Sequence, residues 1–359
     1  MSRREQYPHS GCCGVGTAAN LRFVDPVAAL RRVAFLLERS RASTHRVQAY
    51  RAAAAILLAL PPEEVTRRAT AGTLTELRGI GPKTAAVAAQ AAADEQPGYL
   101  AELENAVAPL AQGGEDLLAA LRGDLHCHSD WSDGGSPVQE MAATAMELGH
   151  DYLAMTDHSP RLTIAHGLSV ERLERQLELV AELNPQLAPF QLLSGIECDI
   201  NADGTLDQTD ELLGRVDVVV ASVHSKLRAD RDTMTQRMLD AVRNPHTDVL
   251  GHCTGRLVTG GRGQRPESQF DAEAVFAACA EHGVAVEINS RPERLDPPRR
   301  LLRQAVEAGC LFSIDTDAHA PGQLDWHAYG CTRAQECGVP VERVINTWSV
   351  DELLGWTGV

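Results

Sequence analysis

The sequence predicts an α/β fold in which a parallel sheet closes, or nearly closes, into a barrel, preceded by a small all-helical domain. Three observations lead to it. After residue 123, short apolar runs alternate with stretches of helical periodicity. Most of these runs are followed directly by a short cluster of His and carboxylate residues. Before residue 93 the apolar residues follow helical spacing interrupted by Pro and Gly.

The chain of 359 residues exceeds the usual size of one domain, although a barrel of about 250 residues can be a single unit. One small and one large domain is therefore the natural division. We expect a disordered tail at 1–22, a helical domain at 23–110, a linker at 111–122 and the barrel at 123–359.

The helical domain begins with Asp25-Pro26, since Asp is a good N-cap and Pro fits the first helical position. A second helix is expected from about Thr44 to Leu58, where Pro61-Pro62 stops it. The segment 73–93 then predicts a short helix, a tight glycine turn and a second, Ala-rich helix.

That turn, Gly79-Ile80-Gly81, precedes Pro82 and is typical of a helix-hairpin-helix motif. Gly79 and Gly81 let the backbone turn tightly, so the amides of Lys83 and Thr84 can face a phosphate oxygen. Such contacts hold a DNA backbone without reading base sequence. The alternative is an ordinary helical hairpin whose glycines only permit close packing.

Charge is distributed unevenly. Residues 21–90 hold eleven basic and five acidic side chains, so this segment is net +6 while the whole chain is net -16. A basic segment can bind phosphates on a chain whose acidic body repels polyanions, particularly where divalent cations offset the negative charge. The alternative is that these Arg residues only form solvated helix faces.

The nine Cys residues are an odd number, and the sequence starts without an apolar signal segment, which favours a reduced, cytoplasmic setting. Cys12-Cys13 is expected to lie in the disordered tail. Cys127, Cys198 and Cys253 each follow a candidate metal ligand and are expected to be buried thiols on the opposite face of a strand. No apolar run approaches the ~18 residues of a membrane span.

Six apolar runs are expected to form buried strands, and the stretches between them helices. In residues 170–183, for example, Leu173, Leu177 and Val180 share one helical face. The expected strands are 152–155, 191–193, 216–223, 249–250, 284–288 and 311–314.

The polar clusters contain nine residues suited to holding metal ions. A β/α barrel gathers residues from the C-terminal ends of its strands onto one face, so ligands far apart in sequence can converge there. The candidates, expected to form one multinuclear site, are His126, His128, Asp133, His158, Glu197, His224, His252, Asp317 and His319.

Residues 123 to about 357 resemble the PHP (polymerase and histidinol phosphatase) domain, in particular the version fused to bacterial family X DNA polymerases. The likeness rests on the nine candidates in order and on motifs such as Gly251-His252-Cys253-Thr254-Gly255-Arg256 and Glu287-Ile288-Asn289. It implies a distorted (β/α)7 barrel. Pro is usual where Cys253 stands, and a small residue where Lys226 and Leu227 stand, which affects substrate shape more than metal binding.

The resemblance further implies three divalent ions, which imidazole and carboxylate ligands allow to be zinc, manganese or iron. It implies that the nine ligands also form the catalytic centre. One ion would be held by His126, His128, Glu197 and Asp317, a second by Glu197, His224 and His252, and a third by Asp133, His158 and His319.

Residues 24–93 resemble the N-terminal domain of family X DNA polymerases, including the stretch from Arg46 to Arg51. Members with lyase activity carry a lysine where this chain has Val87, so lyase chemistry is not expected. Only about thirty residues separate Ala93 from Gly123. A polymerase palm and fingers cannot fit there, and polymerase activity is not expected.

Clustered divalent ions activate water and stabilise a leaving oxygen, so the expected reaction is phosphoester hydrolysis. Asp157 and Asp315 could orient ligand imidazoles, or could equally have plain capping or turn roles. Basic residues near the strand ends could bind phosphate oxygens. They are Arg161, Lys226, Arg256, Arg291 and Arg294.

Three functions follow as alternatives. The leading one is a DNA-end phosphoesterase in repair: a 3'-5' exonuclease, with 3'-phosphatase or abasic-site cleavage possible, whose hairpin domain binds DNA. The second is a small-molecule phosphatase of the histidinol-phosphate type. The third is a non-catalytic DNA-end binding module, which a site of three ions with open positions argues against.

Overall fold

The computed structural model describes residues 25–260 and 263–358. The predicted tail at 1–22, with Cys12-Cys13, lies outside these residues. The described chain forms two compact units: 25–33 with 49–105, and 34–48 with 106–358. The second unit thus begins close to the predicted linker but also includes a segment of the first two helices.

The helical segment contains the elements that its Pro and Gly residues predict. Helix α1 starts at Pro26 and the second helix ends just before the Pro pair. The predicted short helix before the glycine turn is a single 3-10 turn. The elements are α1 (Pro26–Arg39), α2 (Thr44–Leu58), α3 (Pro62–Ala71), η1 (Leu74–Glu76), α4 (Pro82–Ala92) and α5 (Gly98–Asn105).

The second unit is a seven-stranded parallel sheet whose strands pair in sequence order. The ends of the sheet meet, because Cys127 bridges Ala318 in parallel and the His128 amide donates to the Ala318 carbonyl at 2.7 Å. The predicted nearly closed barrel is confirmed. The strands are β1 (Gly123–Cys127), β2 (Tyr152–Met155), β3 (Gln191–Asp199), β4 (Val218–Ser222), β5 (Val249–Leu250), β6 (Ala285–Asn289) and β7 (Phe312–Asp315).

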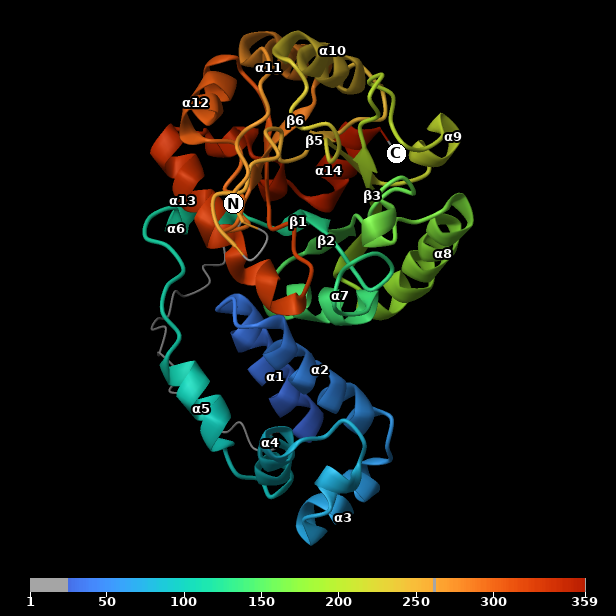
Figure 1. Cartoon of the computed structure of the whole chain (residues 1–359), viewed down its shortest axis with the longest axis vertical. Coiled ribbons are helices and arrows are strands. Elements are labelled where there is room, and N and C mark those ends of the chain that lie inside the picture. Colours follow the sequence, from blue (N-terminus) through green and yellow to red (C-terminus); the bar gives the residue numbers. More distant parts are fainter. Residues whose placement is uncertain (1–24, 261–262, 359) are drawn as a thin grey trace, which may run out of the picture. The chain divides into compact units, whose positions relative to one another are not determined.

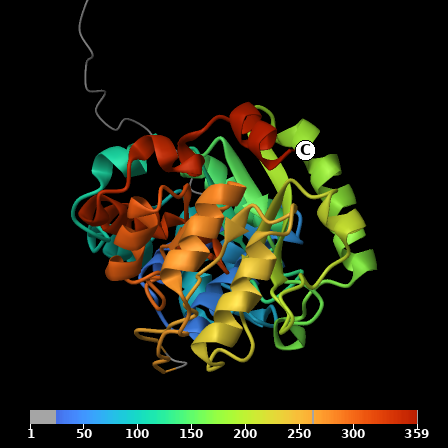
Figure 2. The same ribbon diagram turned by 90° about the horizontal axis from the view of Figure 1, so that it is seen from above.

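Helices surround this sheet (Figures 1 and 2). Several begin at a residue that caps the first turn, such as Ser169 before α8, whose side chain accepts from the Arg172 amide. The helices are α6 (Glu115–Ala120), α7 (Val138–Glu147), α8 (Val170–Leu187), α9 (Asp210–Leu213), α10 (Arg231–Val242), α11 (Ala272–His282), α12 (Arg299–Glu307), α13 (His327–Cys337) and α14 (Val350–Thr357). No helix within the described ranges is long and apolar enough to cross a membrane.

The alternation of side chains along each strand explains why apolar and polar residues share the same inner face. Leu193, Val218 and Ala285 belong to a buried apolar cluster at the start of their strands. Two or four residues further on, the same side of the strand carries Glu197 and Glu287. The interior of the barrel is therefore apolar near the start of these strands and polar near their C-terminal ends.

Asp248, which precedes β5, predicts a pH effect on stability. Its carboxylate accepts from the Val219 amide at 2.8 Å, and burial raises its pKa to about 7. An unfolded Asp titrates near ~3.9. Between these values the folded protein binds more protons than the unfolded chain, so this group's contribution to stability is present at low pH and is lost as pH rises from about 4 to 7.

Asp248→Asn keeps an acceptor for the amide but cannot ionise. We expect its free energy of unfolding to exceed that of the wild type by about 1–3 kcal/mol at pH 8, with little difference at pH 4. Urea unfolding at both pH values measures this. Asp232→Asn, on the exposed face of α10, is the control. A constant difference between the two proteins across pH would contradict the assignment.

Candidate metal centre

The nine predicted ligands converge at the C-terminal ends of the strands. Two of them lie inside strands rather than after them: His126 in β1 and Glu197 in β3. Neighbouring residues of a regular strand face opposite sides, yet Leu125 and His126 both contact groups inside the barrel. This coincides with a register shift of β1 against β2 between Asp124 and Cys127. The others stand on loops beyond the strands, where a β/α barrel collects functional groups.

Glu197 lies at the centre of the cluster and is 1% exposed. Its two carboxylate oxygens face five imidazoles. The separations are 2.8 Å to His158 Nδ1, 2.8 Å to His252 Nε2, 3.2 Å to His224 Nε2, 3.4 Å to His126 Nε2 and 3.6 Å to His128 Nε2.

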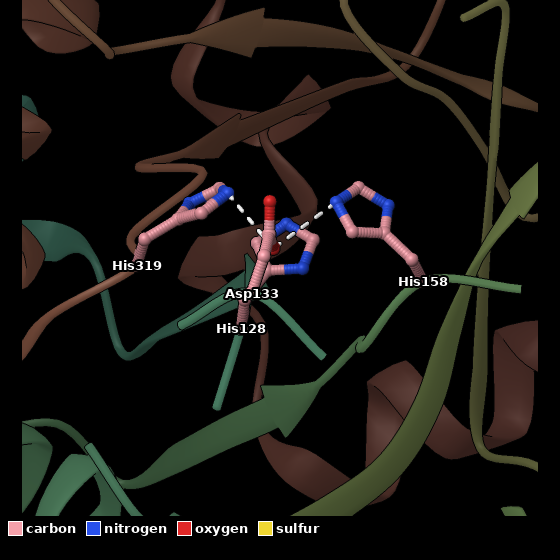
Figure 3. A group of neighbouring side chains, drawn as sticks. All are labelled: His128, Asp133, His158 and His319. Carbon is pink, nitrogen blue, oxygen red and sulfur yellow. Dashed lines mark ion pairs between the residues drawn. The ribbon is translucent and has the colours of Figure 1, made fainter. Parts of the chain in front are cut away.

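Asp133 organises a second part of the cluster. Its Oδ1 lies 3.4 Å from His158 Nε2 and 3.3 Å from His319 Nε2 (Figure 3). His128 stands between these two rings, with its centroid 4.4 Å from that of His158 and 4.2 Å from that of His319. One ligand atom from each of the four residues lies within 4.8 Å of the others, which is close enough to hold one ion.

Asp317 forms the third part, in a left-handed conformation with φ +51°. Its Oδ1 lies 3.5 Å from His128 Nε2, while its Oδ2 accepts from Arg294 Nε at 2.9 Å. The two oxygens thus divide between the cluster and a buried guanidinium. A strained backbone at such a position is typical of a functional site.

The three groups of residues whose ligand atoms lie close enough to hold an ion overlap with the three predicted ligand sets but are not identical to them. His128 joins the group of Asp133, and His158 joins Glu197 and His224. His252 lies outside these three groups yet contacts Glu197 directly. All nine residues belong to one site, and the assignment of each to a particular ion remains a prediction.

Electrostatics keep the carboxylate charged and His128 neutral. Burial alone would raise the pKa of Glu197, but the positive potential of His224, His126 and His158 holds it well below the usual value. Burial, with His319 and His158 alongside, lowers the pKa of His128 well below its usual value. Ionised carboxylates and neutral imidazoles are the forms that bind metals, so Glu197 and His128 are already in these forms. Against the effect of burial, Glu287 and Glu197 instead raise the pKa of His126 well above its usual value, and Glu197 and Asp133 raise that of His158 to about 10, so a cation would have to displace a proton from these two rings.

The unsatisfied atoms of the cluster also fit metal ions. Buried polar atoms are nearly always hydrogen-bonded. Yet Glu197 Oε1 and Oε2 have no hydrogen-bond partner among the described residues, and neither do ring nitrogens of His126, His128, His158, His224 and His252. Divalent cations would satisfy this set of buried lone pairs. Cys127, Cys198 and Cys253 are buried, as predicted, and none of the candidate metal groups of the described residues includes them.

Two positioning carboxylates escaped the sequence analysis. Glu287 Oε1 lies 2.6 Å from His126 Nδ1, and Asp199 lies 3.5 Å from His224 Nδ1. The signal for Glu287 was an acidic residue inside an otherwise apolar run. Such contacts fix the ring orientation of metal-binding imidazoles.

Of the two roles open for Asp157 and Asp315, the described contacts support the structural one and not the orientation of an imidazole. Asp157 accepts from Ser129, Ser132 and Gln176 instead of from an imidazole. Asp315 accepts from the Leu125 amide at 2.9 Å and from Asn346 Nδ2 at 2.8 Å. Both hold backbone segments that carry ligands, because their short side chains reach loops rather than rings.

The candidate phosphate-binding residues differ in their surroundings. Arg161 and Lys226 are exposed on loops after β2 and β4. Arg256 donates to the carbonyl oxygens of Arg294 and Leu295, so it holds the loop after β6. Arg291 Nη1 lies 2.8 Å from both the Asp317 carbonyl oxygen and His319 Nδ1. Among these five, Arg291 and Arg294 directly contact the nine-residue cluster.

Arg291 and Arg294 also carry spare donors. Arg291 Nε and Arg294 Nη1 are buried without a hydrogen-bond partner among the described residues, although Arg291 Nε lies 3.6 Å from Glu293 Oε2 in an ion pair. Arg294 as a whole is 8% exposed. A buried guanidinium with an unused N–H beside a metal centre can donate to a phosphoryl oxygen.

The hairpin has the predicted backbone. Gly79 has φ +100°, and a Cβ there would meet Ile56 Cδ1 at 2.7 Å, so glycine serves both turn and packing. Lys83 is exposed at the start of α4. Thr84 is buried, and its hydroxyl exchanges hydrogen bonds with the backbone of Gly81. Thr84 thus caps the helix, leaving Lys83 and the backbone amides to face a ligand.

Some positive charges of the helical segment are paired with carboxylates and are not available to bind a phosphate. Arg67 and Arg68 both pair with Glu64, at 2.7 and 2.6 Å. Arg78, in contrast, is exposed beside the hairpin. Arg78 and Lys83 are thus two exposed positive charges near the hairpin that can meet a phosphate.

Comparison with known proteins agrees with both resemblances. Residues 124–291 match the family model described as the PHP domain, and residues 20–96 match that of a helix-hairpin-helix domain. DNA polymerase/3'-5' exonuclease PolX of Bacillus subtilis is 37% identical over 236 residues, which cover 66% of this chain and 41% of PolX. The chain therefore matches about two fifths of that relative.

Other relatives match over most of their length. A probable phosphatase of a Thermoanaerobacter species is 26% identical over 239 residues, covering 62% of this chain and 89% of that protein. A solved histidinol phosphate phosphatase from Lactococcus lactis, complexed with zinc, L-histidinol and phosphate, aligns at 19% identity and a TM-score of 0.44 over 60% of this chain and 94% of its own. At that TM-score nothing further follows for this chain.

Proposed function

Because this chain carries a PHP domain behind a helix-hairpin-helix domain, we propose that it is a metal-dependent phosphoesterase that acts on DNA ends: a 3'-5' exonuclease, with 3'-phosphatase or abasic endonuclease activity as further reactions of the same site. One observation carries the hydrolase part. Glu197 and five imidazoles meet at one buried point with their lone pairs unsatisfied within the described chain. Such a set serves metal ions rather than structure alone.

Divalent ions held by the nine residues would supply an activated water and neutralise charge on the phosphoryl group. Asp133, His158 and His319 would hold one of three ions, and Glu197 would be shared between the other two. Zinc and manganese both suit these ligands, with iron possible. Arg291 and Arg294 would donate their spare N–H groups to phosphate oxygens and so orient the ester.

The choice of DNA depends on the hairpin. Lys83 and the first amides of α4 would form an anion site at the helix N-terminus, to which Arg78 would add charge. The curated relative PolX is named as a DNA polymerase and 3'-5' exonuclease. Since this chain covers less than half of PolX, its own use of DNA is a proposal.

A small-molecule phosphatase is the second candidate. The relatives named as probable phosphatases match over 86–89% of their own length. The same metal ligands would hydrolyse a small phosphomonoester. Under this alternative, Lys83 would have no role in turnover.

Parallel assays separate the two candidates. Full-length protein with Mn²⁺ is given a labelled single-stranded DNA, a primer with a 3'-phosphate, and histidinol phosphate. We expect DNA turnover that His158→Ala abolishes for every substrate, whereas His282→Ala, an exposed histidine on α11, leaves it unchanged. Turnover of histidinol phosphate alone would overturn the DNA proposal in favour of the second candidate.

The role of Lys83 has its own test. We expect Lys83→Ala to weaken DNA binding several-fold at ~0.1 M salt and to lower the log–log salt slope by about 1, since one phosphate contact is lost. Arg175→Ala, exposed on α8, is the matched loss of one positive charge. Equal effects of both variants would show that only net charge matters and would remove the hairpin from the proposal.

A further inference from the structure

Glu287 is a buried carboxylate that touches two of the predicted metal ligands. It lies in β6, at 0% exposure. Its Oε1 is 2.6 Å from His126 Nδ1, and its Oε2 accepts from the backbone amide of His252. Oε2 also accepts from Asn289 Nδ2 at 3.2 Å.

The contact with His126 decides which ring nitrogen carries the proton. An ionised carboxylate only accepts hydrogen bonds, so His126 Nδ1 must donate to it. In the neutral ring that binds a cation, the lone pair then lies on Nε2, which faces Glu197 at 3.4 Å and has no hydrogen-bond partner among the described residues. The tautomer set by Glu287 is therefore the one that can bind a cation at the centre of the site.

The contact with His252 fixes a backbone rather than a ring. His252 follows the two-residue strand β5, which offers few ladder hydrogen bonds to position it. Glu287 accepts a hydrogen bond from the backbone amide of His252. In this position the Nε2 atom of the His252 ring lies 2.8 Å from Glu197. One carboxylate thus supports two ligands that the resemblance assigns to different ions.

We propose that Glu287 is a positioning residue that makes cation binding at His126 and at His252 depend on one buried side chain. The inference rests on the metal-dependent function proposed above and adds a residue that is not itself a ligand. It predicts that metal affinity is sensitive to the acceptor capacity of this side chain, not only to its charge.

Glu287→Gln separates the two roles. An amide has one accepting oxygen, so it cannot satisfy His126 and His252 together. The orientation that keeps the His252 and Asn289 contacts turns its NH₂ group towards His126 Nδ1. That orientation moves the His126 proton to Nε2 and removes a ligand. Glu287→Ala, in contrast, releases both histidines.

The test is calorimetric titration of Mn²⁺ or Zn²⁺ into full-length protein stripped of metal. We expect Glu287→Gln to weaken one class of sites 10–100-fold, the range typical of lost partners to metal ligands, and Glu287→Ala to weaken two. Glu281→Gln, exposed on α11, should bind as the wild type does. Unchanged binding by Glu287→Gln overturns the inference, whereas a wild type that binds no metal overturns the proposed function instead.

A double-mutant cycle distinguishes positioning from general stability. If Glu287→Gln acts through His126, it should not weaken metal binding further on a His126→Ala background. Additive losses of affinity in the double variant would contradict action through His126. The metal-induced rise in melting temperature should shrink in the same pattern, which keeps the test informative if the stripped variants are less stable.

Discussion

Glu197→Gln is expected to abolish phosphoester hydrolysis, lowering kcat/KM by at least about 1,000-fold, or about 4 kcal/mol of barrier. The reason is geometric. Both oxygens of Glu197 face imidazoles, and five histidines approach within 3.6 Å. An amide at this position has one donor group pointing at ring nitrogens and carries no charge to bind a cation.

The metal content should fall with the activity. Elemental analysis of the purified variant is expected to show the loss of at least one ion per chain relative to wild type. Glu178→Gln, exposed on α8, removes the same charge without touching the site. A small ester such as bis-p-nitrophenyl phosphate should be the substrate, so that DNA binding does not enter. Full metal content and activity in Glu197→Gln would rule out the central role of this carboxylate.

Much of this site could be predicted because its ligands follow apolar runs. The expected strands 152–155 and 249–250 match β2 and β5. Where a strand itself contains ligands, the apolar pattern failed. The segment before His128 was not predicted as a strand, and β3 runs to Asp199 instead of ending at residue 193. Polar residues that face the inside of a barrel interrupt hydrophobicity without interrupting the strand.

The supporting contacts could not be predicted for a different reason. Glu287 meets His126 across 161 positions of sequence, and Asp124 meets Thr316 across 192. These pairs depend on strand register and on the closing of the sheet between β1 and β7. Periodicity identifies which face a residue occupies, but it does not specify the partner on the opposite side of the barrel.

The arginines illustrate the same limit. Arg256 and Arg291 both lie on a loop that follows a strand, Arg256 after β5 and Arg291 after β6. In the structure, Arg256 donates to two carbonyl oxygens of the loop after β6, whereas Arg291 contacts Asp317 and His319. The difference arises from the loop after β6, whose conformation includes a positive φ at Leu295. Loop conformation of this kind carries no periodic signal.

Asp157→Ala is expected to lower the free energy of unfolding by about 3–5 kcal/mol, the cost typical of removing one partner from a buried charged network. Asp157 is 1% exposed and accepts from the Ser129 amide at 2.8 Å, from Ser129 Oγ at 2.6 Å and from Gln176 Nε2 at 2.6 Å. Ser132 Oγ donates to it as well. Alanine removes the shared acceptor of all four donors from a buried position.

The same change should reach the metal centre through Asp133. The loop from Ser129 to Asp133 is held by Asp157 at two serines, so its release lets Asp133 move away from His158 and His319. Ser132→Ala removes one donor and should cost only about 1 kcal/mol, which makes it the matched control. Denaturant unfolding with and without Mn²⁺ measures both effects. A loss below about 1 kcal/mol in Asp157→Ala, with unchanged metal stabilisation, would show that the loop is held by its own backbone turns instead.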